Sequence, residues 1–243
     1  MFEVVFKTNK NVLLYELLRH KNTFSDLIWS ECVNNKLKFS IYKKFIKNTP
    51  FSVKKYSQNV KKFMNDCLAR DEFLVLSKET EIYKNDLEKM WRKSEKNILK
   101  IVKSIIHMPI EGKYNVYVVH RDSGAGHSVH REKKNTLVWG HHSEFDNYDI
   151  VYITHEIFHS ILPVGYIPHA VQNFAIDNEL RTRLNNCKYS AKNIVTHPFL
   201  KTIMVKILPY WREYLKSDKE TIFDFIKRMQ IVFKKEETEF NNR

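Results

Sequence analysis

The sequence predicts a mostly helical α+β fold with a small β-sheet. Through most of the chain, apolar residues recur at steps of three and four, which is the spacing of an amphipathic helix. Two stretches, 114–120 and 135–139, are instead rich in β-branched and aromatic residues, and this composition favours strands. With 243 residues, 43% of them hydrophobic, the chain is long enough to enclose one compact core.

Two regions are expected along the chain. Residues 1–75 contain short apolar runs at helical spacing and no catalytic motif, so they predict a helical N-terminal region. A longer helix is predicted from Ser77 to about Met108, where Pro109 ends it. Residues 76–243 contain both predicted strands and most of the histidines, and they are predicted to form the second domain.

The most informative stretch is 150–162, which contains His155-Glu156-x-x-His159 in an otherwise apolar run. In a helix, this spacing places both imidazoles one turn apart on the same face, where they can bind one cation. Glu156 is adjacent to His155, so it can contact a water on the metal rather than the metal itself. It is therefore the candidate general base. This HExxH pattern is the signature of zinc hydrolases.

A structural reading of the same residues competes with the metal site. In a chain with 11 histidines, HExxH arises by chance with a probability of roughly a few per cent. The run around it is apolar on almost all sides, however, and predicts a buried helix. Imidazoles and a carboxylate buried there without partners would each cost about 1–3 kcal/mol. A metal ion removes that cost more completely than hydrogen bonds within the core.

A third ligand is needed downstream, because zinc in catalytic sites has three protein ligands. Glu179 follows His159 after 19 intervening residues and is preceded by Asn178. Together with HExxH, this arrangement resembles the gluzincin metallopeptidases of the thermolysin-like type. The resemblance covers two short motifs, and it departs from the family at Arg183, where the family has an aspartate that orients a histidine.

The gluzincin resemblance implies a zincin-like catalytic domain over residues 76–243 that hydrolyses peptide bonds in peptide or protein substrates. It also implies one Zn²⁺ ion, bound by His155, His159 and Glu179, with Glu156 as the general base. The competing interpretation of Glu179 is an ordinary solvated charge on a helix.

His169 is the alternative third ligand. The segment that begins at Pro168 is similar to the third-ligand region of SprT-like, DNA-associated zinc proteases. Both His169 and Glu179 are predicted to lie on one helix, which begins near Pro168 and ends at about Asn185.

Other residues are candidates for contact with a substrate. In thermolysin-like enzymes, an edge strand before the HExxH helix pairs with the substrate backbone, and residues 135–140 have the corresponding place in this chain. The alternative is an ordinary core strand. His197 or Tyr210 could supply the group that stabilises the transition state, which gluzincins place beyond the third ligand.

The net charge of +13 admits a nucleic-acid partner but does not establish one. The lysines are spread along the chain in pairs, without interleaved aromatic residues or a recognisable nucleic-acid-binding motif. We favour a different explanation for the charge: a general excess of Lys, Asn, Ile, Phe and Tyr, as an AT-rich genome would encode.

The composition contains neither a membrane segment nor a cysteine framework. No run of 18 apolar residues exists and the N-terminus lacks a secretory apolar segment, so a cytoplasmic location without a membrane partner is expected. Cys32, Cys67 and Cys187 form no CxxC pair, and we interpret them as small apolar fillers.

These observations lead to one hypothesis and two alternatives. The hypothesis is a zinc-dependent metallopeptidase. The first alternative is a SprT-like, DNA-associated protease with His169 as the third ligand. The second is a non-catalytic protein that has a zincin-like fold and binds nucleic acid.

Overall fold

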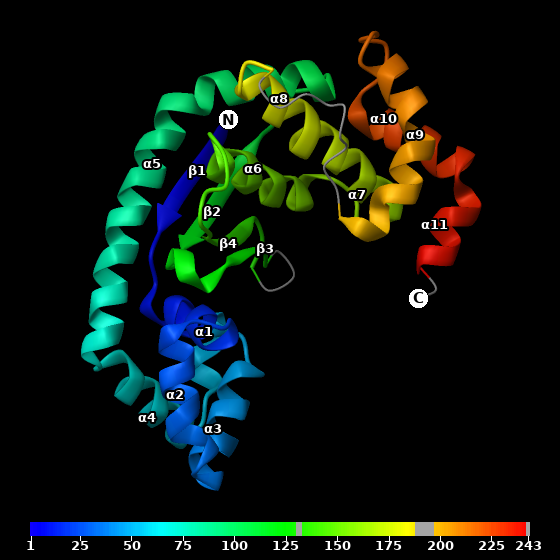
Figure 1. Ribbon diagram of the computed structural model, residues 1–243. Coiled ribbons are helices and arrows are strands. Elements are labelled where there is room, and N and C mark those ends of the chain that lie inside the picture. Colours follow the sequence, from blue (N-terminus) through cyan, green and yellow to red (C-terminus); the bar gives the residue numbers. More distant parts are fainter. Residues whose placement is uncertain (130–132, 188–196, 242–243) are drawn as a thin grey trace. The chain divides into compact units, whose positions relative to one another are not determined.

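Figure 1 shows the computed structural model of the protein, which describes residues 1–129, 133–187 and 197–241. Helices account for most of these residues, and the four strands among them form one sheet. The predicted mostly helical α+β class is therefore confirmed. Within the described ranges, no helix is both long enough and apolar enough to cross a membrane.

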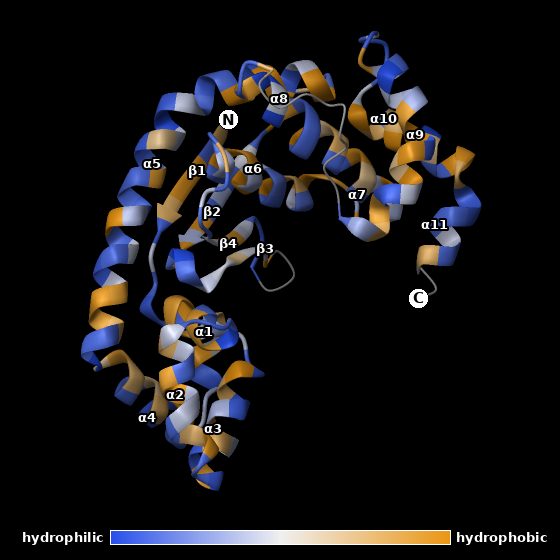
Figure 2. Cartoon of the chain, in the orientation of Figure 1, coloured by the Kyte–Doolittle hydropathy of each residue, from blue (hydrophilic) through white to orange (hydrophobic). Residues whose placement is uncertain are grey.

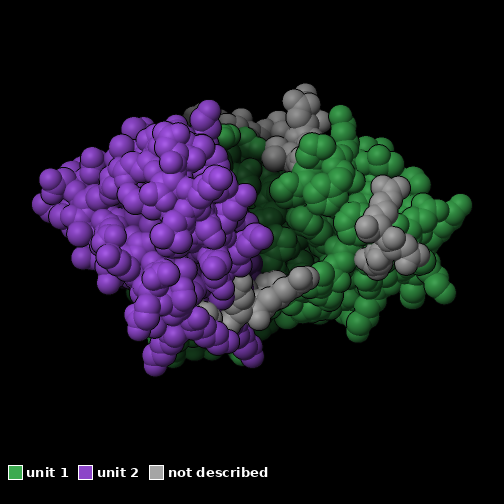
Figure 3. Space-filling view, turned by 90° about the horizontal axis from the view of Figure 1, so that it is seen from below, with its two compact units in different colours: residues 1–3, 90–113, 143–243 green, residues 4–89, 114–142 purple. Residues whose placement is uncertain are grey.

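The chain divides into two compact units that alternate along the sequence (Figure 3). Unit 1 comprises Met1–Glu3, Met90–Lys113 and Ser143–Arg243, and unit 2 comprises Val4–Lys89 and Tyr114–His142. The domain boundary predicted after residue 75 lies inside helix α5 (Asp71–Ile106), which is continuous. Figure 2 shows apolar and polar residues alternating around this helix, as expected for an amphipathic helix.

The sheet consists of strands β1 (Phe2–Lys7), β2 (Gly112–Val118), β3 (Ala125–Ser128) and β4 (Thr136–Gly140). Their order is β1-β2-β4-β3. Strands β2 and β4 are parallel, with Val116 opposite Leu137, whereas β3 and β4 are antiparallel, with Gly126 opposite Trp139. Strands β2 and β4 match the two predicted strands within a few residues.

The prediction that residues 135–140 form an edge strand is wrong. Strand β4 pairs with β2 on one side and with β3 on the other, so its backbone groups are already used. Among the described strands, β1 and β3 form the edges. A substrate backbone cannot add to β4 as an extra strand.

Unit 2 contains the short helices predicted for the N-terminal region. They are α1 (Lys10–Arg19), α2 (Thr23–Val33), α3 (Lys36–Ile46), η1 (Pro50–Lys55), α4 (Gln58–Leu68) and, later in the chain, η2 (Arg121–Ser123). Asn9, Asn22 and Asn35 each cap a helix by accepting hydrogen bonds from its first backbone N–H groups. Leu14 and Phe45 are buried in a core that these helices share with Val138 of the sheet.

Unit 1 contains the remaining helices. They are the second half of α5, α6 (Tyr148–Ile161), α7 (Tyr166–Gln172), the π-helix η3 (Asn173–Leu180), α8 (Arg181–Leu184), η4 (Pro198–Leu200), α9 (Lys201–Tyr214), α10 (Ile222–Val232) and α11 (Lys234–Asn241). Helices α7, η3 and α8 follow one another without a break, so the helix predicted from Pro168 to Asn185 is confirmed. Phe174 of η3 stacks on Trp211 of α9, with ring centroids 5.6 Å apart.

Candidate metal centre

The HExxH residues lie on helix α6, as the sequence predicts. Apolar side chains such as Ile153 and Phe158 are completely buried, and they fix the helix within unit 1. His155 is also buried, whereas Glu156 and His159 are partly exposed. The rings of the two histidines lie one turn apart, with centroids separated by 4.9 Å.

One nitrogen of His155 is occupied by a buried carboxylate. Nδ1 of His155 lies 2.7 Å from Oδ1 of Asp177, and both side chains are almost inaccessible to solvent. An ionised carboxylate can only accept, so Nδ1 donates and Nε2 is the nitrogen left for a cation. The side-chain amide of Gln172 also donates to the backbone carbonyl of His155, over 2.9 Å.

The electrostatic environment of His155 combines opposing effects. Burial lowers the pKa of His155, whereas the charge and hydrogen bond of Asp177 and the charge of Glu156 raise it. The net result is a pKa above the ordinary value. The buried carboxylate is therefore the group that compensates for placing an imidazole in the interior.

Asp177 was missed in the sequence, where the orienting carboxylate was sought at position 183. It lies in the π-helical segment η3, in which the side chains do not follow the ordinary helical period. A signal was nevertheless present. His169, Asn173 and Asp177 recur every fourth residue along a helical segment that also contains many buried apolar residues. Polar residues at that spacing inside an apolar helix mark one shared polar face.

His169 is carried by α7 and approaches both histidines of α6. Its ring centroid lies 5.1 Å from that of His159 and 6.0 Å from that of His155. Burial, followed by the nearby His155 and His197, lowers the pKa of His169 to about 4. Nε2 of His169 is buried and has no hydrogen-bond partner among the described residues. A neutral imidazole with a buried, unpaired nitrogen is a suitable metal ligand.

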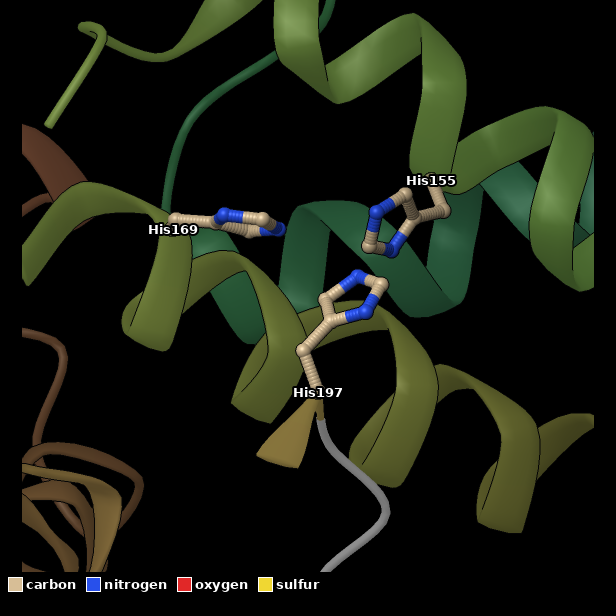
Figure 4. Close-up of side chains that lie close together, drawn as sticks. All are labelled: His155, His169 and His197. Carbon is tan, nitrogen blue, oxygen red and sulfur yellow. The ribbon is translucent and has the colours of Figure 1, made fainter. Parts of the chain in front are cut away.

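His197 reaches the same place from the residue before η4. Figure 4 shows the rings of His155, His169 and His197 turned toward one another. The centroid of His197 is 5.1 Å from that of His169 and 6.3 Å from that of His155. Burial, followed by the charge of His155, lowers the pKa of His197. The sequence singled out His197 only as a possible transition-state donor.

The potential ligand atoms form two groups that share His155. One group contains His155, Glu156 and His159, and the other contains His155, His169 and His197. Within each group, the ligand atoms lie within 4.8 Å of one another. A tetrahedral zinc with bonds of ~2.0–2.1 Å requires about 3.4 Å between ligand atoms, so small side-chain rotations are sufficient. This histidine cluster, defined as His155, Glu156, His159, His169 and His197, could bind a metal ion.

Glu179 belongs to neither group. Its Oε2 atom lies 3.1 Å from both Nε and Nη2 of Arg183, and Nη1 of Arg183 donates to Ser104 on α5 over 3.1 Å. Residues two positions apart do not share a helix face, so Glu179 and Asp177 point in different directions. The role of Glu179 as a zinc ligand thus stays a prediction, without support from its position.

Tyr210, the other candidate donor, lies on α9. Its ring packs edge-on against Phe233, with centroids 5.9 Å apart.

Comparison with known proteins adds no family assignment. The chain matches no protein-family model, no curated protein and no solved structure.

Proposed function

We propose that the protein is a zinc-dependent metallopeptidase. The observation that carries this proposal is the approach of His169 to both histidines of HExxH, one of which is held by Asp177. A third imidazole at this place gives the set of three protein ligands that catalytic zinc sites use. The proposed ligands are His155, His159 and His169.

The donor set fits zinc. Imidazole nitrogens suit Zn²⁺, although they also suit other transition metals. The buried Nε2 of His169 gains a partner when a cation binds, which removes a desolvation cost of about 1–3 kcal/mol. The carboxylate of Asp177 keeps the Nδ1 proton of His155 in place and increases the basicity of Nε2.

The proposed ligand set takes His159 from one group and His169 from the other, so side-chain rotation must bring their nitrogens to the same ion. When bound, zinc polarises a carbonyl group and makes a water acidic enough to ionise near neutral pH. Glu156 is adjacent to the ligand His155 and partly exposed, so its carboxylate can take a proton from the attacking water. The protonated Glu156 then delivers that proton to the leaving amine. The hydrogen bond between Nδ1 of His155 and Asp177 orients the imidazole throughout.

The first experiment separates metal binding from catalysis. Zinc content and cleavage of denatured casein are measured for the wild type and for Glu156→Gln. We expect the variant to retain zinc and to lose activity by at least about 100-fold, the lower limit for loss of a general base. Glu144→Gln, which changes an exposed glutamate of the same unit, is the matched control and should leave both unchanged. Substantial activity in Glu156→Gln would refute the role of Glu156.

The second experiment concerns the substrate. The SprT-like alternative uses the same third ligand, His169, so metal analysis cannot separate it from other metallopeptidases. Cleavage of a DNA-bound protein is therefore compared with cleavage of the same protein without DNA. Stimulation by DNA would favour the SprT-like alternative. Salt-dependent DNA binding without cleavage of either substrate would favour the non-catalytic alternative.

A further inference from the structure

His197 is the imidazole of the histidine cluster that the proposed ligand set does not use. Its ligand atom lies within 4.8 Å of those of His155 and His169, the same limit that holds for the HExxH residues. It comes from a different segment of unit 1, immediately before η4. The side chain of His197 is exposed, whereas that of His155 is buried. His197 can therefore leave the cluster without opening the core.

A row of stacked aromatic rings holds His197 in its orientation. His197 stacks on Phe199, with centroids 5.5 Å apart and planes inclined by 15°. Phe199 stacks on Phe240 of α11 at 6.0 Å and 16°, and Phe240 stacks on Tyr166 of α7 at 4.4 Å and 13°. The hydroxyl of Tyr166 donates to the backbone carbonyl of Phe199 over 3.0 Å. The row fixes the plane of the His197 ring, while the ring faces His155 and His169 (Figure 4).

The number of protein ligands decides what a zinc site can do. Sites with four protein ligands are closed and structural, whereas catalytic sites keep one position for water. His155, His159 and His169 account for three positions. We propose that His197 is a fourth protein ligand that closes the metal centre by competing with water for the remaining position. Release of His197 then opens the centre. This inference rests on the metal centre of the proposed function, but not on its peptidase activity.

The test uses Co²⁺ as a spectroscopic probe and azide as an external ligand for the full chain. Azide must displace His197 in the wild type, whereas His197→Ala presents an open position. We expect His197→Ala to bind Co²⁺ more than about tenfold more weakly than the wild type. Loss of a residue that only contacts a metal ligand already weakens binding about tenfold, and His197 is proposed to be a ligand itself. The same variant should bind azide at least tenfold more tightly. These opposite changes are the signature of a competing ligand.

Two further variants sharpen the test. His142→Ala removes an exposed histidine of unit 2 and should leave both affinities unchanged. Phe199→Leu keeps His197 but removes its stacking partner, so it should tighten azide binding by less than His197→Ala does. Circular dichroism confirms that each variant is folded.

The outcomes separate this inference from the proposed function. Unchanged Co²⁺ and azide affinities in His197→Ala would overturn the fourth ligand, even if the wild type cleaves casein. Weaker binding of both Co²⁺ and azide would also overturn it, because it would indicate a structural role. The opposite changes described above would support the fourth ligand even if no variant cleaves a peptide bond. Where the wild type does cleave casein, His197→Ala should cleave it faster.

Discussion

Asp177 holds the buried imidazole of His155 through a hydrogen bond of 2.7 Å between Oδ1 and Nδ1. The two residues come from different helices, η3 and α6, so the bond fixes the ring relative to the backbone that carries His169. An aspartate that orients a metal-binding histidine also makes its other nitrogen a better donor. Loss of the Asp177 charge should therefore weaken metal binding at His155.

Asp177→Asn should weaken zinc binding by about 10–100-fold, the usual effect of losing an outer-shell carboxylate. The asparagine oxygen can still accept the hydrogen bond, so the main loss is the negative charge. Competition with a chromogenic chelator measures the affinity. Asp149→Asn is the matched control, because Asp149 is also buried in unit 1 but is bound by Ser143. Equal zinc affinities for the wild type and Asp177→Asn would contradict the assignment.

Zinc should stabilise the folded protein through His169 and not through Glu179. A ligand that binds only the folded state adds about 2.7 kcal/mol at a free concentration of 100 times its Kd. We expect the melting temperature of the wild type and of Glu179→Gln to rise when zinc is added. His169→Ala should lose most of that rise. Calorimetry at several zinc concentrations measures the effect, and the reverse pattern for the two variants would restore Glu179 as the third ligand.

The low pKa of His169 predicts how the stability of the metal-free protein depends on pH. Its pKa is about 4 in the folded protein, below the ordinary value of 6.5, because burial and then the neighbouring histidines disfavour the charged ring. Between these values the unfolded chain binds more protons, so protons favour unfolding. The stability that a neutral His169 contributes is complete above pH 6.5 and is lost as the pH falls to about 4.

The comparison with His169→Asn isolates this contribution. His155 acts in the opposite direction because its pKa is raised: its contribution is present below pH 6.5 and is lost at higher pH. The free energy of unfolding of the wild type and of His169→Asn is measured by chemical denaturation from pH 7.5 to 4, after removal of metal. The wild type should lose more stability over this range than the variant. Parallel curves would show that His169 titrates normally.

The three cysteines should react with alkylating agents at very different rates. Cys32 and Cys67 are buried, and burial raises the pKa of Cys67 to about 12, so few thiolates form there. Cys187 is exposed, which corrects its interpretation as an apolar filler. Mass spectrometry after treatment with iodoacetamide at pH 8 should find rapid modification of Cys187 alone, and of all three cysteines in denaturant. Rapid modification of Cys67 in the native protein would contradict its burial.

The sequence predicts those parts of the structure that depend on local pattern. The HExxH spacing places His155 and His159 on one face of a helix, and the apolar run around them predicts that this helix is buried. Both expectations are met in α6. The strands β2 and β4 are rich in β-branched and aromatic residues, and both were predicted. By contrast, β1 was missed although Phe2–Lys7 is rich in valine and phenylalanine, because the whole segment 1–75 was interpreted as helical. Strand β3 contains Ala-Gly-His-Ser, which favours a strand only because β4 pairs with it.

Two adjacent sequences before α10 match the capping-box pattern. One is Ser217-x-x-Glu220, but Thr221 and Asp224 form the box that precedes α10. Glu220 instead makes an ion pair with Arg228. The local pattern alone does not distinguish these two boxes.

The rest of the candidate site depends on tertiary packing. His197 joins the cluster because η4 packs near α7, and no spacing rule in the sequence relates it to His155. Asp177 faces His155 because η3 is a π-helix, whose phase differs from the helical period used to read the sequence. Family spacing favoured Glu179, but the side chain of Arg183 engages that carboxylate.

The most direct test of the metal centre is a crystal structure of the zinc-loaded protein, with anomalous scattering measured on both sides of the zinc absorption edge. The central claim predicts one zinc peak about 2.0–2.1 Å from a ring nitrogen of each of His155, His159 and His169. Glu179 should remain paired with Arg183. A zinc ion bound by Glu179 in place of His169, or no zinc peak at the histidine cluster, would contradict the claim.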